Sequence, residues 1–199
     1  NFIFNYFLLK RDAVKYMYQN NIHSQSSILG SWTDQQIPNT YSCYADFVME
    51  TLMMKVLPKM QKETGLELLP TYSYARVYKK GDILKRHKDR PSCEISTTIH
   101  LGGDPWSIFI DGTGSDNVID EYKNIHKSNA PIGARVDLEV GDMLVYSGCE
   151  LEHWREPFEG EVCGQVFLHY NHVNGQFKDV NLFDGREKLG LPSACRKTK

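Results

Sequence analysis

Residues 78 to 101 read YKKGDILKRHKDRPSCEISTTIHL, and His87 and Asp89 lie near the centre of this segment. On a β-strand, residues i and i+2 project from the same face, so a His-x-Asp step directs an imidazole and a carboxylate to one place. Such a pair supplies two ligands of a metal site. A His-x-Asp pair alone is a weak signal, and a third ligand must come from another part of the chain.

The same segment continues as an alternating strand. In EISTTIHL, the odd-numbered residues 95 to 101 share one face and the even-numbered residues 94 to 100 share the other. The even-numbered face carries polar side chains, which is unusual for the interior of a small barrel. It is expected where a barrel holds a hydrated or charged ligand.

Strand-like periodicity dominates the chain after Pro70, and Gly-containing turn signals separate the segments. The expected strands are 72–79, 83–89, 94–101, 106–111, 135–140, 143–147, 151–157 and 163–170. This pattern predicts a mainly β protein of the α+β type, a jelly roll with N-terminal helices packed on one outer face.

Helical patterns precede the strands. Residues 11–20 have helical composition, and residues 44–64 form the longest helical pattern, which Gly65 ends. Pro58 lies inside that pattern and should kink or split the helix. The apolar stretch from Phe2 to Leu9 is expected to be a buried strand or the start of a helix. We therefore expect one domain over 1–199: a helical region over about 1–69, a jelly-roll core over about 70–172, and a C-terminal strap over about 173–199 with a free basic tip.

Composition narrows the function classes. With 199 residues, a net charge of -2 and a pI near 6.4, the chain is not expected to bind nucleic acid through bulk charge. Five cysteines without a Cys-x-x-Cys pair, and no apolar run of membrane-spanning length, favour a cytosolic protein that does not enter a membrane. Because the given sequence starts at Asn1 and not at Met, the expected cytosolic location does not take a targeting signal into account. We expect a monomer or a weak oligomer.

The third ligand is predicted to be His153, in YSGCELEHWREPFEG, because it follows a Gly-Asp turn and an expected strand. For any single other histidine, a structural role is the expected one. The others are His23, His100, His126, His169 and His172.

These residues together carry a family resemblance. Tyr78 lies nine residues before His87, the His87-x-Asp89 pair precedes a GDMLVY strand, and His153 is followed by Pro157, Phe158 and Gly160. This order resembles the Fe(II)/2-oxoglutarate-dependent dioxygenase superfamily over about residues 70–172, and most of all its prolyl 4-hydroxylase-type catalytic domains.

The resemblance implies a fold and a chemistry. It implies a double-stranded β-helix in which His87, Asp89 and His153 hold Fe(II) through one face of the metal, leaving positions for 2-oxoglutarate and O2. Ascorbate would be an added reductant. The implied enzyme hydroxylates a C–H bond of a peptide or an amino acid.

The cation that binds the far carboxylate of 2-oxoglutarate departs from the family pattern. Prolyl hydroxylase-type domains usually carry a Lys or Arg nine or ten residues after the distal histidine, where this chain has Val162 and Cys163. Arg155 lies two residues after His153 and should enter the same pocket, where it could hold a carboxylate through two hydrogen bonds. The alternative is a surface arginine paired with Glu152 or Glu156.

Three further residues are candidates for the same pocket. Tyr78 matches a tyrosine that contacts the cosubstrate in these hydroxylases, and His100 lies on the strand where related enzymes place a Tyr or Lys. Arg76, two residues before Tyr78 on the same face, is the reserve candidate for the carboxylate.

Other features leave two interpretations open. Six of the residues 79–90 are basic, which indicates either a solvated strand edge or a rim for an anionic substrate. Trp106 and Trp154 are either core residues or stacking partners of a substrate. The polar segment 112–130 is either a surface excursion or a lid.

The alternative functions are an oxidative demethylase of alkylated nucleic acid, which the net charge disfavours, and a barrel that binds a metal or a small acid without turnover. Peptides and small molecules are the expected partners.

Overall fold

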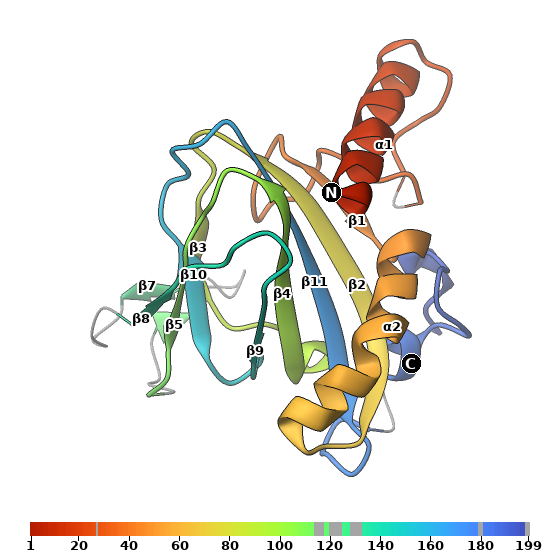
Figure 1. Cartoon of the computed structure of the whole chain (residues 1–199). Helices are drawn as coiled ribbons and strands as arrows, with labels where there is room; N and C mark the ends of the chain where they lie inside the picture. The colour runs from red at the N-terminus through yellow and green to blue at the C-terminus, as the bar shows by residue number, and fades with distance from the viewer. Residues whose placement is uncertain (27, 114–117, 120–124, 128–132, 179–180, 198–199) are drawn as a thin grey trace.

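Two antiparallel sheets face each other in this computed structural model, which describes residues 1–26, 28–113, 118–119, 125–127, 133–178 and 181–197 (Figure 1). The larger sheet has the order β1-β2-β11-β4-β9, and the smaller has the order β3-β10-β5-β8. The arrangement is a jelly roll, so the predicted fold class is confirmed.

The strands of the larger sheet are β1 (Tyr41–Tyr44), β2 (Leu68–Lys79), β4 (Ile95–Gly103), β9 (Met143–Tyr146) and β11 (Val162–His172). Those of the smaller sheet are β3 (Leu84–His87), β5 (Ile108–Asp111), β8 (Ala134–Val136) and β10 (Glu152–Arg155). A separate pair, β6 (Val118–Ile119) with β7 (Ile125–Lys127), interrupts the segment 112–130. The choice between a lid and a surface excursion for that segment concerns residues that lie mainly outside the described part of the chain.

Each expected strand after Pro70 has a counterpart, with shifted ends. The clearest difference is that β3 ends at His87, although the pattern predicted a strand over 83–89. Strand β1 was not predicted, because Tyr44 falls at the start of the expected helix over 44–64 and residues 41–43 fall in no expected element. It forms through long-range pairing with β2, in which Tyr41 lies opposite Val77 and Tyr44 opposite Tyr74.

The helices α1 (Phe2–Gln19) and α2 (Phe47–Thr64) lie outside the larger sheet, α2 across β2 and β11 (Figure 1). Asp46 caps the N-terminus of α2, since its carboxylate accepts hydrogen bonds from the N–H groups of Val48 (2.9 Å) and Met49 (3.1 Å). Gly65 ends α2 in the left-handed conformation. Pro58 does not split α2, and residues 2–9 are helical. Neither helix has the length and apolar character needed to cross a bilayer.

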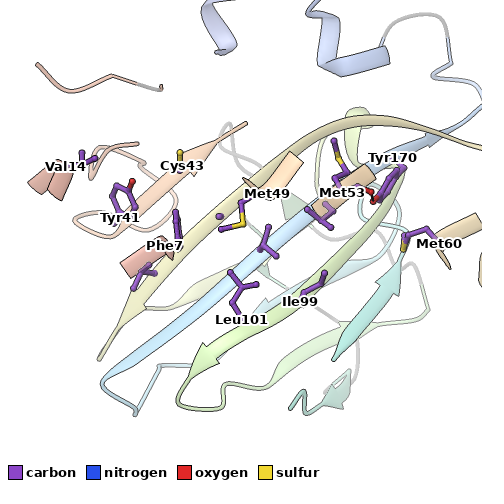
Figure 2. Close-up of a cluster of buried hydrophobic side chains, with 14 of the residues drawn as sticks. Phe7, Val14, Tyr41, Cys43, Met49, Met53, Met60, Ile99, Leu101 and Tyr170 are labelled. Atoms are coloured by element: carbon purple, nitrogen blue, oxygen red, sulfur yellow. Dashed lines mark hydrogen bonds between the residues drawn. The ribbon is translucent and has the colours of Figure 1, made fainter. Parts of the chain in front are cut away.

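Alternation along the strands of the larger sheet separates two environments. On β4 and β11, Ile99, Leu101, Val166 and Leu168 point outward and pack under the helices, as Figure 2 shows in part. The intervening residues point toward the smaller sheet: the Thr98 hydroxyl donates to the Gln165 side chain (3.1 Å). The polar interior that the alternation predicted is therefore present, and the main apolar core lies outside the barrel.

The C-terminal residues contain two 3-10 turns, η2 (Leu182–Gly185) and η3 (Ser193–Cys195), and pack beside β2 and α2 (Figure 1). The predicted free basic tip is wrong for its described part. Arg196 forms an ion pair with Asp184, and Lys197 pairs with Glu187 (2.9 Å).

We expect Met53→Ala to lower the free energy of unfolding by about 2–5 kcal/mol, because it opens a cavity between α2 and the sheet. Met53 is fully buried in this core. Met54→Ala is the matched control on the same helix, since Met54 is 44% exposed. Urea denaturation of both variants provides the comparison, and equal losses would contradict this assignment of the core.

Candidate metal centre

Two histidines face each other across neighbouring strands of the smaller sheet. His87, the last residue of β3, is the antiparallel partner of His153 on β10, and their ring centroids are 4.3 Å apart. Asp89 lies two residues beyond the end of β3. Its carboxylate oxygens are 3.4 Å from His87 Nε2 and 3.6 Å from His153 Nε2. The structure therefore brings the three predicted ligands together.

Backbone carbonyls determine which ring nitrogen of each histidine can bind a metal. His87 Nδ1 donates to the Lys85 carbonyl (2.7 Å), and His153 Nδ1 donates to the Leu151 carbonyl (3.0 Å). Because a carbonyl only accepts, each Nδ1 carries the hydrogen and each Nε2 carries a lone pair. Both lone pairs are on the side of Asp89, as a metal shared by the three residues requires.

The surroundings of His153 and Asp89 favour the metal-binding forms of these two side chains. Burial, helped by the neighbouring His87, lowers the pKa of His153 to about 4, so this imidazole is neutral near pH 7. Burial by itself raises the pKa of the Asp89 carboxyl, but the facing imidazoles of His153 and His87 outweigh it and hold that pKa below its ordinary value. His153 is therefore a neutral imidazole and Asp89 a carboxylate near pH 7.

Asp89 sits against a glycine. Its N–H donates to the Gly148 carbonyl (2.8 Å), and a Cβ atom at Gly148 would lie 2.8 Å from Asp89 Oδ2 and 2.6 Å from Ser96 Oγ. Both distances are shorter than real Cβ contacts. Only glycine at position 148 leaves the carboxylate in its place.

A cavity of about 340 Å³ opens beside the triad, between the two sheets. Four of its lining residues, Tyr72, Tyr74, Arg76 and Tyr78, alternate along β2. The others are Asp34, Gln36, Leu84, His87, Lys88, Asp89, Arg90, Tyr146, His153, Phe167 and His169. The volume is at the small end for ligand pockets, so it suits a compact polar molecule.

A loop before β1 forms one wall of this cavity. Ile37 is buried in a cluster with Tyr78 and attaches the loop to the barrel. The Asp34 carboxylate binds Arg76 Nη2 (2.5 Å), and the Gln36 side-chain oxygen Oε1 accepts from Arg76 Nη1 (3.2 Å). The Gln36 amide nitrogen lies 3.1 Å from His87 Nε2 and donates to its lone pair. The loop thus reaches the metal-binding nitrogen itself.

Arg155 is fully buried, two residues after His153. It donates from Nη1 to the Trp106 carbonyl and from Nη2 to the Thr98 hydroxyl (3.4 Å), while its Nε has no partner. No carboxylate among the described residues pairs with it, so the surface interpretation with Glu152 or Glu156 is wrong. Burial accordingly lowers the pKa of Arg155. An unpaired buried guanidinium is costly unless a ligand supplies the counter-charge.

Two other predicted pocket residues have different surroundings. Tyr78 lines the cavity, and its buried hydroxyl has no hydrogen-bond partner among the described residues. His100 is buried on β4, where its Nδ1 donates to the Leu138 carbonyl (3.1 Å) and its Nε2 has no hydrogen-bond partner among the described residues; it does not line the cavity beside the triad. The structure does not bring His100 to the triad.

The basic cluster and the tryptophans agree with their structural interpretations. Acidic partners are present for at least four of the six basic residues: Lys79 pairs with Asp82, Lys80 with Glu161, Arg86 with Asp111 and Glu152, and Arg90 with Asp184. Trp106 and Trp154 are buried, and their N–H groups donate to the Glu156 carbonyl and carboxylate. A strongly cationic rim is therefore not present in this part of the chain.

Several cavity residues were not predicted. The alternation in TYSYARVY contained a signal for Tyr72 and Tyr74, because they share a face with Arg76 and Tyr78. Asp34 and Gln36 lie in a loop whose sequence has no helical or strand period, so no sequence pattern indicated that they line the cavity.

Comparison with solved structures supports the fold. Neither family models nor curated proteins gave a sequence match. HygX from Streptomyces hygroscopicus, whose crystal structure has nickel and 2-oxoglutarate bound, is 15% identical over 72% of this chain and 74% of its own, with a TM-score of 0.54. SnoK, a non-heme alpha ketoglutarate dependent carbocyclase from nogalamycin biosynthesis, is 12% identical over 92% and 84%, with a TM-score of 0.55. AviO1 from Streptomyces viridochromogenes Tue57 is 12% identical over 84% and 83%, with a TM-score of 0.56. At these identities, the similarity establishes a shared fold.

We expect Gly148→Ala to weaken metal binding about tenfold or more, because the new methyl group displaces the Asp89 carboxylate and changes in the support of a ligand typically cost 10–100-fold. Gly112→Ala is the matched control, since a Cβ there meets no described atom within 4 Å. Calorimetric titration with Co(II) measures the difference. Unchanged affinity in Gly148→Ala would show that Asp89 is not a ligand.

Proposed function

We propose that this protein is an Fe(II)- and 2-oxoglutarate-dependent dioxygenase that hydroxylates a C–H bond of a peptide, an amino acid or another small molecule. The observation that carries the proposal is the combination of a two-histidine, one-carboxylate set with a nearby buried arginine that has no counter-ion. The first is the facial ligand set of non-haem iron oxygenases. The second is what a dicarboxylate cosubstrate needs at its far end.

The donor set fits the proposed groups. His87, His153 and Asp89 would hold the iron, and Arg155 with the Tyr78 hydroxyl would bind the far carboxylate of 2-oxoglutarate. The Arg155 guanidinium and the Tyr78 hydroxyl are both buried, and each has a hydrogen-bonding atom without a partner among the described residues. When bound, iron and 2-oxoglutarate supply an oxidative decarboxylation by O2 that gives succinate, carbon dioxide and a hydroxylated substrate. The chain contributes ligand geometry, cosubstrate orientation and exclusion of water by the aromatic walls of the cavity.

Comparison among the buried arginines favours Arg155 over Arg76 as the anchor. Arg76 is already paired with Asp34, and Arg186, a third buried arginine, is paired with Glu50 (2.8 Å). In the described part of the chain, Arg155 is the buried arginine without a carboxylate. Arg155 does not itself line the cavity, but Tyr78 and Tyr146, which do, are among the groups that act on its pKa.

A prolyl 4-hydroxylase-type reaction on a peptide or a free amino acid is the specific activity we propose. It rests on the sequence order from Tyr78 to Gly160. Demethylation of alkylated nucleic acid has less support, because the basic residues near the site are largely neutralised by acidic partners. A barrel that binds a metal or a small acid without turnover has less support, because all three ligands of the triad are present beside the cavity and a catalytically inactive relative would usually lose one.

We expect the anaerobic protein with Fe(II) and 2-oxoglutarate to show a weak visible charge-transfer band, and to produce succinate when O2 is admitted. His153→Ala should abolish both, since it removes a ligand. Proline-rich peptides and methylated oligonucleotides are then compared for their stimulation of succinate release. Absence of both band and succinate in the wild-type protein would exclude the oxygenase.

We expect Arg155→Ala to weaken 2-oxoglutarate binding at least about 30-fold, because truncating one partner of a buried charge pair costs about 2 kcal/mol or more. The KM for 2-oxoglutarate should rise accordingly, and the affinity for Fe(II) should stay nearly unchanged.

Arg76→Ala is the comparison, since Arg76 already has a carboxylate partner. A large KM effect confined to Arg76→Ala would transfer the anchor to Arg76. Equal losses of iron and cosubstrate affinity in Arg155→Ala would indicate a folding role.

A further inference from the structure

A carboxylate from the C-terminal strap binds the residue next to the metal ligand Asp89. Asp184 is buried in η2 and accepts two hydrogen bonds from Arg90, from Nη1 (2.5 Å) and from Nη2 (2.8 Å). The same carboxylate accepts from the Ser92 hydroxyl (2.9 Å) and the Tyr44 hydroxyl (2.6 Å). A two-pronged guanidinium–carboxylate contact of this kind fixes orientation as well as distance.

The local backbone of the strap is unusual at this point. Phe183 and Asp184 have φ values of 49° and 58°, in the left-handed region that non-glycine residues seldom adopt. The carboxyl group of Asp184 is thereby directed into the cluster around Arg90. The hydrogen bonds that Arg90, Ser92 and Tyr44 donate hold this conformation.

Asp89 depends on supports outside the sheets. Because β3 ends at His87, the segment 88–90 has no strand pairing, and few backbone hydrogen bonds hold Asp89 and Arg90 within the described structure. The Asp89 N–H donates to the Gly148 carbonyl (2.8 Å), and the Arg90 carbonyl accepts from the Cys93 N–H (2.9 Å). The Arg90 side chain adds a third support, since it lies over the Tyr72 ring (4.3 Å to the centroid) and ends in Asp184.

We propose that Asp184 is a positioning residue of the metal centre, which acts through Arg90 to hold the Asp89 carboxylate opposite the two imidazoles. The inference rests on the proposed function only in taking His87, Asp89 and His153 as metal ligands. The C-terminal strap is then part of the metal site, although no strap residue touches the triad.

The strap carries a second buried ion pair that separates this role from simple docking. Arg186 Nη2 binds Glu50 on α2 (2.8 Å) and the Thr71 carbonyl (3.0 Å). This pair attaches the same strap to the same side of the barrel and contacts no residue of the segment 87–93. Glu50→Gln therefore weakens strap docking without changing the support of Arg90.

The test is a Co(II) titration of the full chain, read by calorimetry and by the visible spectrum of the bound metal. Asp184→Asn should weaken Co(II) binding about tenfold and alter the spectrum, whereas Glu50→Gln should change the affinity by less than about twofold, because only the former disturbs the support of a ligand. Thermal unfolding of both variants is measured alongside, and their losses of stability are expected to be comparable.

A double-mutant cycle tests the route through Arg90. The effect of Asp184→Asn should be absent in an Arg90→Gln background, since the two residues act as one unit. Arg90→Lys, which keeps the charge but loses the two-pronged contact, gives an intermediate affinity and serves if Asp184→Asn does not fold.

Three outcomes overturn the inference. Equal weakening by Asp184→Asn and Glu50→Gln would reduce Asp184 to strap docking, and additive effects in the cycle would exclude the route through Arg90. Normal Co(II) affinity in Asp184→Asn would remove the role altogether. Failure of the wild-type protein to bind Co(II) would instead overturn the proposed metal site itself.

Discussion

The pairing of β3 with β10 is the constraint on which the site depends. Antiparallel pairing places His87 opposite His153, and the carbonyls of Lys85 and Leu151 orient both rings so that their lone pairs face the same side. Neither imidazole could be moved to another register without turning its side chain to the opposite face of the sheet. The jelly roll supplies this pairing, and the separate apolar core under α1 and α2 stabilises it from outside the barrel.

Placing the main core outside the barrel leaves the space between the sheets for polar groups. Tyr78, Thr98, Gln165 and Arg155 all lie in this interior, where each needs hydrogen-bond partners. Most of the buried charges are balanced by the chain itself, as in the pairs Arg76–Asp34 and Arg186–Glu50. Arg155 is the exception in the described structure, and a buried charge without a partner is the physical reason to infer an anionic ligand there.

Residues outside the triad set the shape of the site. The loop that contains Asp34 and Gln36 closes one wall, Gly148 leaves room for the Asp89 carboxylate, and Asp184 anchors Arg90 from the C-terminal strap. These contacts join segments that lie far apart in the sequence. They give a ligand on an irregular segment the rigidity that a strand would otherwise supply.

The sequence by itself determined the parts that depend on local period and residue type. Period-two alternation after Pro70 predicted the jelly roll and the polar interior of β4, and the order of Tyr78, His87, Asp89 and His153 predicted the candidate triad through a family resemblance. Only the tertiary structure decided the rest. It ended β3 before Asp89, left Arg155 without a counter-ion among the described residues and brought Asp184 to Arg90. The physical reason is that contacts between irregular segments, or between residues some 40 to 90 positions apart, follow no period in the chain and arise only when the two sheets and the strap pack together.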